Sequence, residues 1–153
     1  MQVINSTIED IDTIFKFYDI AIAYQKTKFN KHWQGFDREL VETEIAEKRQ
    51  YKILVDGKVA CVFAVTFNDA AIWGERDKAP AIYLHRIVTD NTFRGNNFVT
   101  AIMKWAVDYF PLPLSHRFTC NSFLPHITYL LYRIGAGCCC WPGFVRSSAL
   151  IFN

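Results

Sequence analysis

The chain has 153 residues, of which 51% are hydrophobic and 16% aromatic, and a formal net charge of +2. This length and apolar content exclude a disordered chain and predict a single domain, residues 1–153, with a substantial core. The small net charge argues against nucleic acid as a partner. No positively charged segment precedes an apolar run at the N-terminus, so we expect a cytoplasmic protein without a signal peptide or membrane association.

The first predicted elements are a strand over Met1–Asn5 and a helix that follows it. Ser6 or Thr7 can cap this helix, and Ser6-x-x-Glu9 has the form of a capping box. Apolar residues spaced three to four apart predict one buried face for the helix. They are Ile8, Ile11, Ile14, Phe15, Tyr18 and Ile22.

A second helix is predicted to begin after Asp37, which is a favourable N-cap residue. Between the two helices lies the aromatic-rich segment Thr27–Phe36, whose His32 we interpret as a surface histidine. In the second helix the apolar residues should face the core and the charged residues should face water. The first group is Leu40, Val41 and Ile45, and the second is Glu42, Glu44, Glu47 and Lys48.

Two strands, Tyr51–Val55 and Lys58–Phe67, are joined by Asp56-Gly57, which is a strong hairpin signal. The second strand has apolar residues on both faces, as a central strand does, and we interpret its Cys61 as an inert core thiol. The charges of the following loop, residues 68–80, are interpreted as those of a solvated connection.

The next segment predicts a strand over Ala81–Thr89, a polar turn over Asp90–Arg94 and a helix that begins near Asn96. The strand is apolar on both faces, and the helix has one apolar face. Gly95 lets the backbone turn tightly and approach a ligand. The free amides of a helix N-terminus, together with Arg94, form a site suited to phosphate.

This strand, turn and helix resemble motif A of the GNAT family, the acyl-CoA-dependent N-acyltransferases. The family pattern is Gln/Arg-x-x-Gly-x-Gly/Ala, often Arg-Gly-x-Gly-x-Gly, and this chain has Arg94-Gly95-Asn96-Asn97-Phe98-Val99. The order of predicted elements extends the resemblance over about residues 1–110. It implies an α/β fold with a mixed, mostly antiparallel central sheet flanked by helices.

The resemblance further implies acetyl-CoA as co-substrate, with no metal, bound between the fourth and fifth strands. Pantetheine would pair with Ile87, Val88 and Thr89. Backbone N–H groups would supply much of the pyrophosphate contact, so Asn97 can replace glycine, whereas the branched Val99 should lower the affinity. The pyrophosphate residues would be Arg94, Gly95, Asn96, Asn97, Phe98 and Val99.

For the acetyl transfer itself, His85 lies where family members often place a glutamate that helps to remove the ammonium proton. A hydrogen-bonded structural histidine is the alternative interpretation of His85, and Arg86 should pair with a carboxylate or line the cleft. Phe29 and Trp33 would form a wall of the acceptor site, or simply pack under a loop. Tyr132 is nominated as the proton donor to the leaving thiolate, although its spacing departs from the family pattern.

Composition changes at Phe110–Pro111. Residues 111–153 contain none of the 15 acidic residues and no lysine. They do not match the second half of the family, so the fifth strand that walls the cofactor cleft is expected to be missing. A translated wrong reading frame would explain this tail, and a divergent genuine C-terminus is the alternative. A membrane span is disfavoured by interrupting residues, and a metal site at Cys138–Cys140 by its spacing.

The first functional hypothesis is therefore an N-acetyltransferase acting on an amine of unspecified identity, with its activity impaired by the tail. The second is a non-catalytic acyl-CoA-binding or protein-interaction module on the same scaffold. Family practice and an apolar tail also predict a homodimer.

Overall fold

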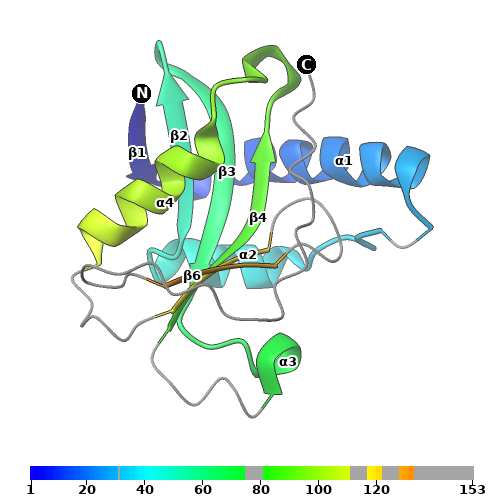
Figure 1. The fold of residues 1–153 in the computed structure, drawn as a ribbon. Coiled ribbons are helices and arrows are strands. Elements are labelled where there is room, and N and C mark those ends of the chain that lie inside the picture. Colours follow the sequence, from blue (N-terminus) through cyan, green and yellow to red (C-terminus); the bar gives the residue numbers. More distant parts are fainter. Residues whose placement is uncertain (31, 75–80, 111–116, 122–127, 133–153) are drawn as a thin grey trace.

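The computed structural model describes residues 1–30, 32–74, 81–110, 117–121 and 128–132 (Figure 1). Through α4 the helices and strands follow the predicted order, except for the short helix α3 inside the predicted loop. They are β1 (Gln2–Asn5), η1 (Ile8–Asp10), α1 (Ile11–Lys28), α2 (Arg38–Ala46), β2 (Gln50–Val55), β3 (Lys58–Thr66), α3 (Ala70–Trp73), β4 (Ala81–Thr89), η3 (Asn91–Phe93), α4 (Phe98–Tyr109), β5 (Arg117–Asn121) and β6 (Thr128–Tyr132).

The six strands form one sheet in the order β1-β2-β3-β4-β5-β6. Neighbouring strands are antiparallel except for β4 and β5, which are parallel. Helix α4 covers one face of this sheet, and α1 and α2 cover the other (Figure 1). The predicted mixed, mostly antiparallel sheet with flanking helices is confirmed.

Each face of the sheet carries its own core. On the α4 face, the Tyr51 ring stacks on Phe63 with centroids 5.3 Å apart and meets Trp105 at 4.6 Å. On the opposite face, α1 residues such as Ile14 pack with Val62 and Val88 of the sheet. The two-faced pattern of β3 and β4 is therefore explained by helices on both sides. Cys61 is fully buried in the α4-side core, as predicted for a core thiol.

The helix boundaries show where local signals succeed and fail. Asp37 caps α2 as predicted, because its side chain accepts from the Glu39 backbone N–H at 3.1 Å. The capping box predicted at Ser6 and Glu9 is wrong by one residue and lies at Thr7 and Asp10. The Thr7 backbone N–H donates to the Asp10 carboxylate at 2.7 Å. Ile8 therefore falls in η1, outside the α1 stripe, and is 56% exposed.

The hairpin between β2 and β3 forms as predicted. Asp56 and Gly57 both have positive φ, at 50° and 76°, as a tight turn between twisted strands requires. In contrast to the prediction of a missing fifth strand, β5 pairs with β4, so two segments of the tail belong to the sheet. The origin of the tail stays a hypothesis, and Cys138–Cys140 lie outside the described residues.

Within the described ranges, the model contains no helix with the length and apolar character needed to cross a bilayer. The same ranges hold no cluster of three or more His, Cys, Asp or Glu residues placed to bind a metal ion.

Candidate functional site

Strand β4 contains a bulge in the middle of the sheet. Val62 of β3 is level with Val88, whereas Ala64 is level with His85, so a single β3 residue opposes both Arg86 and Ile87. Arg86 adopts a left-handed backbone with φ of 50°. A bulge inserts one residue and interrupts the alternation of side chains.

The bulge places two neighbouring polar side chains on the same face of the sheet. Leu84 and Ile87 both pack in the core under α4. Between them, Arg86 reaches Tyr18 of α1 and Glu44 of α2, and His85 lines a cavity with Arg86 and Glu44. His85 and Arg86 therefore both face the α1/α2 side, which regular alternation would forbid.

The same region marks the end of pairing between β4 and β5. The register runs from Ala81, level with Arg117, to His85, level with Asn121. Within the described residues, the rest of β4 is paired only with β3, through Val88 and Thr89. The backbone of Ile87, Val88 and Thr89 thus has one edge without a neighbouring strand in the described part of the chain. An extended ligand with amide groups could pair with that edge.

After β4 the chain turns into the N-terminus of α4. The Asp90 carboxylate accepts from the Thr92 backbone N–H at 2.8 Å and fixes the start of η3. Arg94 is exposed, and its guanidinium lies 5.7 Å from the Tyr24 ring centroid. Gly95 has φ of 87°, a conformation that favours glycine. The backbone amides that open α4 lack intrahelical acceptors and point at the space before it.

Asn97 is the N-cap of α4 and has a left-handed backbone, with φ of 51° and ψ of 37°. Asparagine visits this region more readily than other non-glycine residues, so it can occupy the position of a motif glycine. The neighbouring Val99 is half-buried and packs against the core under α4. Its side chain therefore packs into the protein, and the lower affinity expected from Val99 stays a prediction.

Replacing Asn97 tests this conformation. We expect Asn97→Gly to keep or slightly raise the melting temperature, and Asn97→Val to lower the free energy of unfolding by about 1–2 kcal/mol. Urea unfolding of both variants measures the difference. Equal stability of the two variants would contradict a left-handed Asn97.

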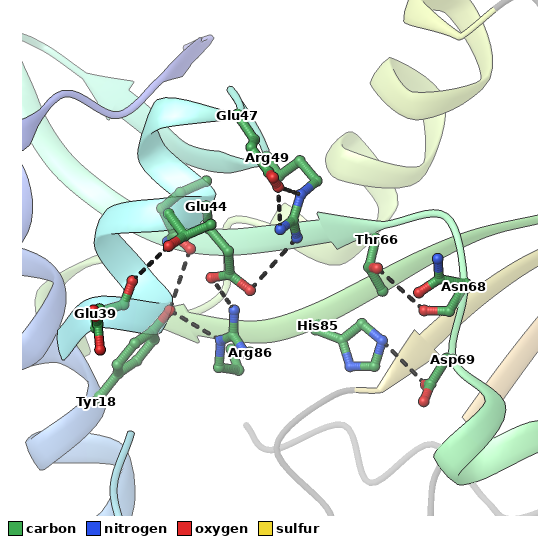
Figure 2. Close-up of polar contacts among 12 residues, drawn as sticks. Tyr18, Glu39, Glu44, Glu47, Arg49, Thr66, Asn68, Asp69, His85 and Arg86 are labelled. Carbon is green, nitrogen blue, oxygen red and sulfur yellow. Dashed lines mark hydrogen bonds and ion pairs between the residues drawn. The ribbon is translucent and has the colours of Figure 1, made fainter. Parts of the chain in front are cut away.

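A buried network of charges joins α2 to β4 (Figure 2). The Glu44 carboxylate contacts Arg86 Nη2 and, at 3.7 Å, Arg49 Nη1. Arg86 Nε donates to the Tyr18 hydroxyl oxygen at 3.2 Å. The side chain of Glu44 is only 6% exposed. Glu44 was predicted to face water, which is wrong: it neutralises Arg86, confirming that this arginine pairs with a carboxylate.

Burial and charge shift the proton affinities of this network in definite directions. Burial acts to lower the pKa of Arg86, but Tyr18 and Glu44 outweigh it, so the pKa is raised and the guanidinium stays charged. Burial raises the pKa of the Tyr18 hydroxyl above its usual value, although Arg86 opposes this effect. Tyr18 is therefore a neutral hydrogen-bonding group at neutral pH.

His85 lies beside this network at the edge of a cavity of about 300 Å³. Its Nε2 is 3.2 Å from Oδ2 of Asp69, and the two side chains are 18% and 10% exposed. Burial lowers the pKa of His85, opposed by Asp69 and assisted by Arg86. The imidazole is therefore neutral at pH 7 and able to accept a proton. Arg49, Glu44 and Arg86 also line the cavity.

The other predicted site residues are placed as follows. Trp33 packs beside Phe36, with ring centroids 5.2 Å apart, and its backbone N–H donates to Gln25 Oε1 at 2.8 Å. Phe29 is the half-buried C-cap of α1. These contacts match the packing interpretation, and an acceptor role for either aromatic stays a prediction.

Tyr132 ends β6, where its backbone is level with Arg117 and hence with Ala81 of β4. By the same register, Tyr129 is level with Cys120 and hence with Leu84, next to His85. The register places Tyr129, and not Tyr132, near the bulge. The role of Tyr132 as proton donor stays untested.

Two residues of the site, Glu44 and Asp69, were not predicted from the sequence. A signal for Glu44 exists, because it follows Val41 by three residues and so shares its buried helix face. Asp69 depends on the turn after β3, where the Thr66 hydroxyl donates to the Asn68 carbonyl oxygen at 3.1 Å. No periodic pattern in the sequence indicates that turn.

Comparison with known proteins identifies the fold. No family model matches the chain, and no curated protein sequence matches it. A GNAT-family acetyltransferase from Listeria monocytogenes 4b F2365 superposes with a TM-score of 0.62 at 19% identity, covering 78% of this chain and 76% of that chain. A GNAT-family acetyltransferase from Streptococcus agalactiae 2603 gives 0.59 at 18% identity, covering 78% and 73%.

A GNAT-like decarboxylase in complex with isobutyryl-CoA gives a TM-score of 0.54 at 11% identity, covering 78% of this chain and 65% of that chain. At these identities the likeness establishes the architecture, so the chain has the GNAT fold. The resemblance predicted from the strand, turn and helix is confirmed at this level. Because these proteins include acetyltransferases and a decarboxylase, the reaction has to be argued from the site.

Proposed function

We propose that the chain is an N-acyltransferase that moves an acetyl group from acetyl-CoA to an amine. The observation that carries this proposal is the edge of β4 beyond His85, which has no neighbouring strand among the described residues and precedes the Arg94–Asn97 turn and the N-terminus of α4. An amide-pairing edge followed by an anion site matches the pantetheine and pyrophosphate of CoA. The fold supports the same cofactor.

The described residues would bind the cofactor through both backbone and side-chain groups. Ile87, Val88 and Thr89 would pair with pantetheine through the backbone edge that no strand of the described residues occupies. Gly95, Asn96, Asn97, Phe98 and Val99 would offer backbone amides to the pyrophosphate, and the exposed Arg94 would supply charge. Since the Asn96 side chain donates to the Phe93 carbonyl oxygen at 2.8 Å, its own role is to hold the turn.

In the transfer step, the amine nitrogen attacks the thioester carbonyl carbon and the C–S bond breaks, releasing CoA as a thiolate. The attacking nitrogen must be unprotonated, and holding it near the carbonyl supplies much of the acceleration. His85, neutral through burial, accepts the ammonium proton. The thiolate can take a proton from water, or from Tyr132 if the nomination of that residue holds.

The acceptor would enter from the α1/α2 side, where the cavity opens beside His85. Phe29 and Trp33 belong to the segment between α1 and α2 and are the proposed wall of that side. Within this proposal the protein works in the cytoplasm, and it forms a homodimer, as expected from the family resemblance and the apolar tail.

Calorimetric titration with acetyl-CoA, with free CoA as the control ligand, tests the cofactor site. Micromolar binding of both is expected. A folded chain that binds neither would contradict the proposal. If binding is present but no amine releases CoA thiol, the chain is the alternative, an acyl-CoA-binding module without transferase activity.

Reversing the charge of Arg94 isolates the pyrophosphate contact. We expect Arg94→Glu to weaken acetyl-CoA binding at least tenfold, about 1.4 kcal/mol or more, because a carboxylate replaces a cation at an anion site. Lys48→Glu, in the exposed turn after α2, makes the same charge change away from the site and should leave the affinity unchanged. Equal weakening by both variants would indicate a general charge effect.

A further inference from the structure

Asp69 lies outside the motif on which the proposed function is based, yet it contacts the central histidine. It follows β3 and precedes the short helix α3, and its carboxylate returns toward β4 (Figure 2). Oδ2 of Asp69 is 3.2 Å from Nε2 of His85. Both side chains are largely buried, so water screens the contact only weakly.

The groups around His85 indicate which of its ring nitrogens carries the proton. Arg86, the next residue on β4, is held by Glu44 of α2, and Arg49 lines the same cavity. The Tyr83 ring lies 6.4 Å from the imidazole, between centroids. Of these groups, Asp69 is the acceptor within reach of Nε2. A neutral imidazole carries one N–H, and a carboxylate at Nε2 favours the tautomer with the proton there.

We propose that Asp69 is a positioning residue that holds the proton of neutral His85 on Nε2, which leaves Nδ1 as the atom that accepts the proton of an amine in the adjacent cavity. The proposal rests on the proposed function for the identity of the amine, but its tautomer statement concerns this chain alone. When Nδ1 takes the proton, the imidazolium is stabilised by the facing carboxylate.

The geometry of the contact is that of a site whose hydrogen bonds align only when the substrate binds. Nε2 and Oδ2 lie within hydrogen-bonding distance at 3.2 Å, but Nε2–H is not aligned with Oδ2 as a hydrogen bond. Catalytic hydrogen bonds are often poorly aligned before substrate binds and tighten in the complex. The Thr66–Asn68 hydrogen bond restrains the backbone next to Asp69.

The test is nitrogen-15 NMR of the His85 ring in the full chain. We expect the Nε2–H tautomer in the wild type, and in Asp69→Asn a loss of that preference and a lower pKa for His85, because the opposing carboxylate is gone. Asp19→Asn, on the exposed face of α1, makes the same charge change and should alter neither. An Nδ1–H tautomer in the wild type would overturn the proposal.

Enzyme kinetics distinguish a positioning role of Asp69 from a role in folding alone. Asp69→Asn should lower kcat about tenfold or more, leave the KM for acetyl-CoA unchanged, and move the acid limb of the rate to lower pH. An unchanged kcat in an active enzyme would overturn the proposal. If the NMR result holds but the wild type has no transferase activity, the tautomer assignment stands and the proposed function fails.

Discussion

Replacing Glu44 by alanine is expected to cost about 3–5 kcal/mol of unfolding free energy, which is the cost of leaving a buried cation without its partner. Glu44 is the carboxylate that faces Arg86, and the side chains of the two residues are 6% and 14% exposed. Arg86 keeps its charge in the variant, because a guanidinium stays protonated at neutral pH even without an acidic partner. A domain of this size has about 5–15 kcal/mol in total, so the loss is severe.

Urea unfolding measures the effect, and Glu47→Ala is the matched control. Glu47 also contacts Arg49, but its side chain is 55% exposed, so its removal should cost less than about 1 kcal/mol. Replacing the pair together, with Glu44→Leu and Arg86→Met, should recover most of the loss, because no buried charge is then left unpaired. A cost for Glu44→Ala no greater than that for Glu47→Ala would show that the network is not buried in solution.

The second large effect is expected at His85. His85→Gln removes the proton acceptor while keeping a polar side chain of similar length, and kcat/KM should fall about 100-fold. For the wild-type enzyme, a plot of kcat/KM against pH should fall on the acid side. Because burial lowers the pKa of His85, activity is full at pH 7 and falls only below pH ~6.5, the ordinary histidine value.

The pH profile distinguishes a base from a structural histidine. His85→Gln should be slow at every pH and lose the acid limb, whereas binding of acetyl-CoA to the variant stays unchanged. A variant that loses rate but keeps the limb would assign the titrating group elsewhere. A variant that loses cofactor binding would indicate a structural role, the other interpretation of this histidine.

Periodic features of the chain could be predicted from the sequence, and single contacts could not. Ala81–Thr89 was predicted as a strand with the bounds that β4 has, because both of its faces are apolar and a turn signal follows. The hairpin at Asp56-Gly57 followed from turn chemistry. The fold class needed only the order of such elements.

The misses share a physical cause, which is that tertiary packing overrides local preference. Glutamate usually faces water, but Glu44 is buried because Arg86 stands opposite it. Asp69 was not predicted because an irregular turn brings it to His85. The bulge itself has a trace in the sequence: the residues of β4 in the α4-side core are Ile82, Leu84 and Ile87, so the interval lengthens by one residue at the bulge.

Because of that extra residue, different requirements act on the polar and the apolar positions of β4. Substitution at position 85 changes the polar side chain that lines the cavity, while the apolar row that supports α4 stays as it is. Position 86 is constrained separately, because Arg86 is the partner of the buried Glu44. In evolutionary terms, the bulge makes position 85 of β4 one where activity can diversify while the architecture is inherited intact.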